Sequence, residues 1–228
     1  TWPSKTFETM YLLICILTVL RACQGDSPAK PVTPLTPADA ASLLEHAIRN
    51  TRAQASYETT FQSRAQKPGS APIDYKGSAV WVAPQVLYVE YTATGGDHKK
   101  IVRAGDSAWV YHTLVDDWVS DAEAGMAGAG KGIQNPDDIL AAAAGHTADA
   151  KLVESGLAEL KFTGQTLAKI LKGQGNVNDL DWDKSSATLR IRVDEQTRVR
   201  QLTVDAVLQT KGEKPESLTY TAQVDVAG

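Results

Sequence analysis

The chain has 228 residues, of which 43% are hydrophobic and 22% are charged, and its net charge is −4. These values are typical of a globular protein with one ordinary domain, and they exclude a disordered or fibrous chain. The acidic balance argues against nucleic acid as a partner, because nucleic-acid-binding proteins usually carry a basic stripe. Four histidines and two cysteines limit the metal chemistry available to it.

The first residues predict an export signal rather than part of the fold. An apolar run over 11–20 ends in the sequence Leu-Arg-Ala-Cys at Cys23. The run is shorter than the roughly 20 residues that span a membrane as a helix, and it matches the apolar region of a secretory signal. The four residues resemble the lipobox of bacterial lipoproteins, although Arg21 stands where a small residue is usual. We expect a signal peptide over 1–22, a lipidated Cys23 with a Pro-rich tether over 23–35, and a single domain over 36–228. The alternative is a plain signal peptide or a poor membrane anchor.

The domain opens with a predicted helix over 36–48 and a predicted strand over 56–66. Thr36 and Pro37 supply a capping hydroxyl and a proline for the first turn, and apolar residues then recur at helical spacing,. In 56–66 the side chains alternate with a period of two.

The stretch 75–118 predicts successive antiparallel strands separated by tight turns at 95–97 and 104–106. Glycine at these turns tolerates the positive φ that hairpins need. Alternation places two sets of residues on opposite faces: Leu87, Val89, Tyr91 and Ala93 on one, and Val86, Tyr88, Glu90 and Thr92 on the other. Which face of Trp81, Trp109 and Trp118 points inward stays open, because a one-residue slip in register exchanges the faces.

The next segment, 120–134, is rich in Gly and Ala and predicts a flexible loop, with a movable lid as a secondary interpretation,. Residues 125–131 fit the spacing of a phosphate-binding loop. We reject that interpretation, because Gly132 stands where Ser or Thr would bind magnesium.

The remaining elements complete an α+β architecture. A helix is expected from Asn135-Pro136 to Ala144, by the same capping logic. The pattern then predicts a hairpin over 151–164, with a helix over 149–160 as the competing interpretation. A short helix over 166–172, a loop over 176–183 and three alternating runs near 188–193, 202–208 and 218–226 follow.

The sequence shows no pattern of a catalytic, metal or cofactor site. The histidines occur singly, without a partner at zinc spacing,. Asp179, Asp181 and Asp183 mimic the opening of a calcium loop, but Lys184 stands where glycine is needed. No nucleophile-elbow motif occurs. We therefore expect neither an enzyme nor a cofactor.

The order of these elements carries a resemblance to a known family. A lipobox-like cysteine, a tether and a helix precede strands reading GSAVWVAP, VLYVEY and IVRAGDSAWVYH, then a helix opened by NPDDIL, a strand reading LKFTGQ, a short helix and long terminal strands. Over 36–226 this order resembles the LolA/LolB superfamily of periplasmic lipoprotein carriers, and more narrowly the LppX/LprG group of actinobacterial lipoproteins. The resemblance implies a strongly bent antiparallel half-barrel whose concave face is covered by a few helices. It also implies a hydrophobic cavity for lipid or glycolipid acyl chains.

The resemblance implies that apolar side chains of the strands and helices line this cavity. The expected lining residues are Tyr57, Phe61, Val80, Val82, Leu87, Val89, Tyr91, Val102, Trp109, Tyr111, Ile139, Leu140, Ile170, Leu202 and Val204. The small side chains of Ala141–Ala144 favour a cavity, because they supply little volume to fill it.

Three functions follow as hypotheses for a monomer held outside the cytoplasm by its lipid anchor. The first is binding or carriage of lipid or glycolipid acyl chains. The second is a chaperone or sorting factor for other lipoproteins, of the LolA/LolB kind. The third is a non-catalytic sensor or interaction module of the cell envelope.

Overall fold

The computed structural model describes residues 40–126, 129–130, 135–170, 179–212 and 215–227, all within the compact unit Pro34–Gly228. The predicted signal peptide, the lipidated Cys23 and the tether lie outside the described residues. So does the start of the first predicted helix.

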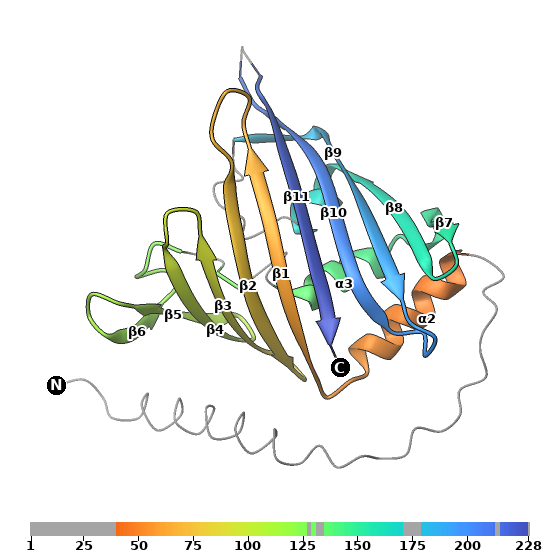
Figure 1. Cartoon of the computed structure of the whole chain (residues 1–228), viewed down its shortest axis with the longest axis horizontal. Coiled ribbons are helices and arrows are strands. Elements are labelled where there is room, and N and C mark those ends of the chain that lie inside the picture. Colours follow the sequence, from red (N-terminus) through yellow and green to blue (C-terminus); the bar gives the residue numbers. More distant parts are fainter. Residues whose placement is uncertain (1–39, 127–128, 131–134, 171–178, 213–214, 228) are drawn as a thin grey trace. The chain divides into compact units, whose positions relative to one another are not determined.

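One antiparallel sheet of eleven strands forms the framework (Figure 1). In space the order is β6-β5-β4-β3-β2-β1-β11-β10-β9-β8-β7, and the two edge strands, β6 and β7, do not pair. The strands are β1 (Ser56–Gln66), β2 (Ile73–Val82), β3 (Val86–Ala93), β4 (His98–Ala104), β5 (Ser107–His112), β6 (Asp117–Ser120), β7 (Lys151–Glu154), β8 (Leu157–Thr163), β9 (Leu180–Val193), β10 (Val199–Thr210) and β11 (Ser217–Ala227). The predicted α+β fold, an open half-barrel, is confirmed.

Strands β1 to β6 pair in sequence order, and so do β7 to β11; the two series meet at the centre of the sheet. There β1 pairs with the last strand, β11, so that Phe61 lies opposite Val224. This pairing joins the first six strands to the last five in one sheet. It follows from no local pattern, because the paired residues lie more than 150 positions apart.

In the described part of the chain, three α-helices accompany the sheet: α2 (Ala40–Arg52), α3 (Pro136–Ala144) and α4 (Gly164–Ile170). A 3₁₀ turn, η2 (Thr147–Asp149), follows α3. Apolar residues of all three helices, such as Leu44, Leu140 and Leu167, join one core cluster with a single face of the sheet. The helices therefore cover that face, which we call the inner face.

The helix boundaries depend on local capping. Asn135 caps α3, because its side-chain oxygen accepts a hydrogen bond from the Asp137 N–H at 3.2 Å, and Pro136 occupies the first turn,. The predicted helix over 36–48 continues to Arg52. Its last turn buries Thr51, a polar residue that breaks the apolar pattern in the sequence.

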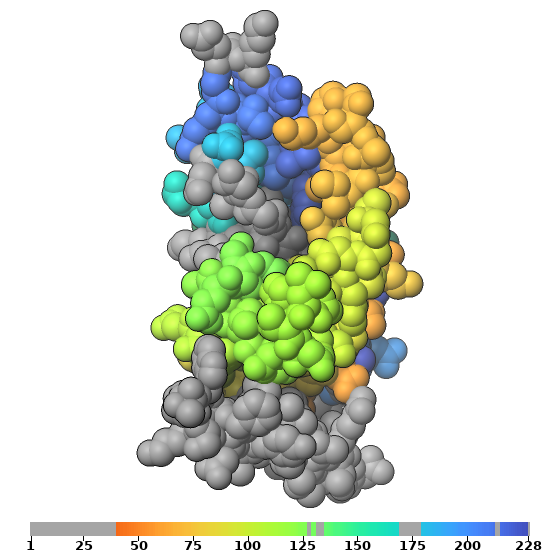
Figure 2. Space-filling model, turned by 90° about the vertical axis from the view of Figure 1, so that its left-hand side faces the viewer, coloured from red at the N-terminus to blue at the C-terminus, as the bar shows by residue number. Residues whose placement is uncertain are grey.

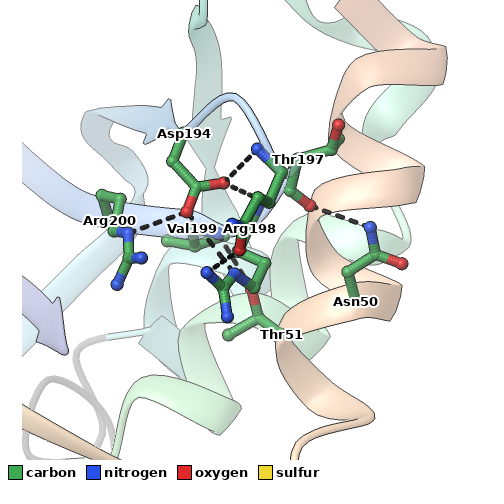
Figure 3. Close-up of polar contacts among 8 residues, drawn as sticks. Asn50, Thr51, Asp194, Thr197, Arg198, Val199 and Arg200 are labelled. Carbon is green, nitrogen blue, oxygen red and sulfur yellow. Dashed lines mark hydrogen bonds and ion pairs between the residues drawn. The ribbon is translucent and has the colours of Figure 1, made fainter. Parts of the chain in front are cut away.

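Thr51 belongs to a polar cluster that fixes the end of α2 against the β9–β10 turn (Figure 3). Its hydroxyl accepts a hydrogen bond from the buried Val199 N–H at 2.9 Å, and the Asn50 side chain donates to the Thr197 carbonyl at 3.0 Å. The Asp194 carboxylate accepts from the Arg198 N–H at 2.8 Å and from Arg200 Nε at 2.9 Å. The bonds of Thr51 and Asn50 position α2, because buried polar groups are costly to leave unpaired, and those of Asp194 hold the turn itself,.

Two expectations for the second half of the chain are settled by the strand pairing. The hairpin over 151–164 is confirmed as β7 and β8, so the competing helix over 149–160 is wrong. The loop expected over 176–183 is wrong from Leu180 onward, because β9 already begins there. A register shift lets this polar start of β9 pair with β10, where Ser185 Oγ accepts a hydrogen bond from the Gln209 N–H at 3.0 Å,.

Candidate functional site

The inner face of the sheet is a continuous apolar surface built from alternate residues of neighbouring strands. One row across the strands runs Thr59, Ala79, Val89, Ile101 and Val110, and each of these side chains is at most 3% exposed. Several expected lining residues belong to this face or to the helix above it, and all are buried: Tyr57, Phe61, Leu87, Val89, Tyr91, Leu202, Val204, Ile139 and Leu140.

Five other expected lining residues lie on the opposite, outer face of the same strands. Val80 pairs with Tyr88, Tyr88 with Val102, and Val102 with Trp109, while Val82 and Tyr111 keep the same parity. Side chains alternate between faces, so these five point away from the helices and do not join the inner set. The prediction combined residues from both faces. The side chain of Ile170 lies outside the described part of the chain.

The register also answers which tryptophans point inward. Trp81 lies on the inner face, 7% exposed, directly opposite Tyr57 and Leu87. Trp109 and Trp118 lie on the outer face near the β6 edge, the side of the molecule that Figure 2 shows with this part of the chain in green. Trp81 and Ile101 were missing from the expected lining set. The short turn between β2 and β3 could have predicted the position of Trp81, because it fixes the register that places Trp81 opposite Leu87.

The two halves of the inner face are covered differently. Helices α2 and α4 contact strands β7 to β10, whereas α3 contacts mainly α2 and α4. Over the β1–β5 half, the segment after β6 contributes small or flexible side chains to the core, among them Ala124, Met126 and Ala129. Its described residues also form hydrogen bonds with the sheet, such as the bond from the Asp121 N–H to the Ala108 carbonyl at 3.0 Å.

One row of the inner face carries two polar side chains, Tyr57 and Arg103. The row runs Tyr57, Trp81, Leu87, Arg103 and Ala108 across β1 to β5. Tyr57 and Trp81 stack with ring centroids 5.0 Å apart. Arg103 is only 6% exposed, and its Nη1 donates to the Ala129 carbonyl at 3.3 Å.

The Tyr57 hydroxyl is buried and has no hydrogen-bond partner among the residues that the structure describes. Burial is the main cause that raises the pKa of Tyr57, with Asp137 adding to it, so the hydroxyl stays protonated. An unpaired buried hydroxyl costs free energy that a phenyl ring of the same shape does not.

We expect Tyr57→Phe to raise the free energy of unfolding by about 1 kcal/mol. Tyr220 offers a matched control, because it is buried on the same face and its hydroxyl hydrogen-bonds with Ser63. Tyr220→Phe should lower the free energy of unfolding by a similar amount. Urea unfolding of both variants measures the two signs, and a loss of stability in Tyr57→Phe would contradict the assignment.

A pocket of about 600 Å³ opens at this row, within the size range of small-molecule sites,. Trp81 and Leu87 form its apolar part, and Arg103 lies beside them; the start of α3 and His146 contribute further polar groups. A second hollow of about 410 Å³ lies on the outer face around Gly77, and a groove of about 560 Å³ runs between the end of α2 and Ala144–Thr147. Of these three, only the first combines the inner-face residues Trp81 and Leu87 of β2 and β3 with a buried charge, that of Arg103.

The part of the chain that the structure describes contains neither a cluster of metal ligands nor a membrane-spanning helix. No three His, Cys, Asp or Glu side chains there converge as metal ligands. Asp181, from the calcium-like motif, pairs instead with Lys184 at 3.1 Å. Within the same residues, no helix has the length and apolar character to cross a bilayer.

The fold and this site define an open α+β half-barrel with an apolar inner face. Solved structures with a similar fold include the lipoprotein LppX of Mycobacterium tuberculosis, with 11% identity, a TM-score of 0.45 and coverage of 85% of this chain and 95% of that one. LprF of Mycobacterium bovis has 10% identity, a TM-score of 0.42 and coverage of 83% and 91%. A LolA-superfamily protein of Nitrosomonas europaea has 12% identity, a TM-score of 0.37 and coverage of 83% and 92%.

The resemblance that the sequence predicts is thus found among solved structures, as a likeness in fold. No family model matches the sequence, and no curated protein matches it significantly. The function proposed below therefore rests on this chain's own residues.

Proposed function

We propose that this protein binds the acyl chains of a lipid or glycolipid on the inner face of its sheet. One observation supports the proposal: the apolar inner face extends over β1–β5, whereas α2 and α4 contact β7–β10 and α3 contacts mainly those two helices. The segment after β6 covers part of β1–β5 and contributes alanines and one methionine, Met126, to the core. A cover of this kind is exchanged for a hydrocarbon chain at smaller cost than a packed helix, because it buries less apolar surface of its own.

The energetics support binding of a chain of moderate length. Each buried CH₂ group contributes about 0.8 kcal/mol, so ten carbons contribute on the order of 8 kcal/mol before ordering costs. The inner-face side chains that would contact the chain, such as Val89 and Ile101, are aliphatic and fully buried. A chain bound there replaces contacts that the segment after β6 makes now.

The position of Trp81 gives a direct test. A brominated fatty acid quenches only tryptophans in contact with it, and Trp81 lies on the inner face while Trp109 lies on the outer face. We expect saturable quenching of the wild-type chain, loss of most of the quenched signal in Trp81→Phe, and its retention in the matched variant Trp109→Phe. Quenching that persists in Trp81→Phe, or no quenching of the wild type, would refute acyl binding at this face.

We further propose that Cys23 is acylated and holds the domain at a membrane outside the cytoplasm. The support is the lipobox-like sequence that ends at Cys23 and the Pro-rich stretch after it. In a bacterial host, Cys23→Ala should move the protein from the membrane fraction to the soluble extracytoplasmic fraction. It should also abolish incorporation of an alkyne-labelled palmitate. Labelling that survives in Cys23→Ala would rule out this anchor.

A further inference from the structure

We propose that Arg103 binds the single negative charge of an amphiphile, a carboxylate or a phosphodiester, in the 600 Å³ pocket at the end of the inner face. This inference rests on the proposed acyl-binding function and names the chemical class of the ligand. The charged group would lie at Arg103, and the apolar part would lie along Trp81 and Leu87.

Arg103 is a buried charge without a counter-charge among the described residues. Its side chain is 6% exposed on an otherwise apolar face. Its one polar contact in the described chain is the 3.3 Å bond to the Ala129 carbonyl, and no carboxylate of that part of the chain lies within 4.0 Å. A guanidinium has five N–H donors, so most of its hydrogen-bonding capacity is unused. Burying an unpaired charge is costly, which favours a ligand that supplies the missing anion.

The pocket places this charge next to an apolar surface. Trp81, Leu87 and Arg103 lie opposite one another on β2, β3 and β4, and all three line the pocket. An amphiphile with a charged end and a hydrocarbon chain matches that arrangement, since its charged end would contact Arg103 and its chain would contact Trp81 and Leu87. The N-terminal turn of the nine-residue helix α3 also borders the pocket, through Asn135 and Asp137, and its dipole favours an anion,.

Carboxylates at the pocket limit how much negative charge it accepts. Asp137 is already paired with Arg52, whose Nε lies 2.7 Å from Oδ1 and whose Nη2 lies 3.3 Å from Oδ2. Asp138 has a polar contact of its own, and Asp106 lies on an exposed turn. These groups leave room for one added negative charge beside Arg103 and disfavour a second, because like charges repel. A monoanion is therefore favoured over a phosphate monoester or free phosphate.

The test compares ligands that differ only in the charge. Using the mature chain, the affinity of a dansyl-labelled C11 fatty acid is measured beside that of its methyl ester. We expect the acid to bind at least tenfold more tightly than the ester. Arg103→Met should reduce this ratio to near one while leaving the ester affinity within about twofold, Arg103→Lys should retain part of the preference, and Arg64→Met, on the exposed outer face, should retain all of it.

Two further arms identify the source of the anion. Phosphatidylglycerol against diacylglycerol tests a phosphodiester, and the fatty acid against its ester tests a carboxylate. Competition by 10 mM inorganic phosphate should be weak. Equal affinities for acid and ester and for phosphatidylglycerol and diacylglycerol in the wild type would overturn the role of Arg103 without any variant, while acyl binding itself would stand. Absence of binding by all four ligands would overturn both proposals, and a preference that persists in folded Arg103→Met would overturn this one alone.

Discussion

Gly77→Ala is expected to lower the free energy of unfolding by about 3 kcal/mol, because β2 and β3 have no room for another atom at this position. A Cβ at Gly77 would overlap with the Glu90 carbonyl oxygen and would lie 2.6 Å from the Tyr91 Cβ. Both contacts are with the adjacent strand β3, so relief requires the two strands to move apart. That movement would break the pairing of Gly77 with Tyr91.

Gly145→Ala is the matched control for this substitution. Gly145 follows α3 with φ −76°, and its nearest neighbour to an added Cβ is the Ala142 carbonyl oxygen at 3.8 Å. We expect Gly145→Ala to change stability by less than about 0.5 kcal/mol, or to raise it slightly by restricting the unfolded chain. Guanidinium unfolding measures the change in unfolding free energy of both variants. Equal changes would contradict the prediction and show that β2 and β3 can move apart to accommodate the Cβ.

Phe162→Ala is expected to cost about 3–5 kcal/mol of unfolding free energy, the range for removal of a fully buried aromatic side chain. Phe162 is 2% exposed on the inner face of β8. It also contacts His146 edge to face, with ring centroids 5.5 Å apart, directly after α3. The substitution would therefore leave a cavity beneath the end of α3 as well as remove apolar surface.

Two comparisons separate the cavity from other effects. Phe162→Leu retains most of the volume and should cost clearly less than the alanine variant. Leu152→Ala, in the adjacent strand β7 where the side chain is 44% exposed, should stay within about 0.5 kcal/mol,. Thermal unfolding by circular dichroism ranks the stabilities of the three variants. A loss of unfolding free energy below about 1 kcal/mol in Phe162→Ala would mean that the core beside α3 rearranges to fill the cavity.

The periodic elements were predictable from the sequence because their signals are local. The expected strand over 56–66 is β1, with the same limits, and the helix that begins after Asn135 is α3. Alternation also separated the two faces of β3 correctly, with Leu87, Val89 and Tyr91 buried on one side. Each prediction used side-chain period, a cap or a turn glycine, which are properties of a few neighbouring residues.

The beginning of β9 and the last turn of α2 were not predictable in this way. Asp181, Asp183 and Lys184 interrupt the apolar pattern at the start of β9, and the strand continues there because a register shift and the Ser185 side chain satisfy its backbone against β10. Thr51 stays helical because its hydroxyl meets the Val199 N–H, 148 positions along the chain. Both depend on hydrogen-bond partners elsewhere in the chain, which a local sequence pattern does not reveal.

The sequence by itself therefore determined the strands, the helix starts and the apolar character of alternate residues. Only the tertiary structure decided that Trp81 points inward and Trp109 outward, that β1 meets β11, and that Arg103 lies buried beside the pocket. The physical reason is that periodicity defines two faces of a strand without saying which one the helices cover. That choice depends on the register between strands and on long-range packing, and here it separates the residues that can contact a ligand from those on the outer face.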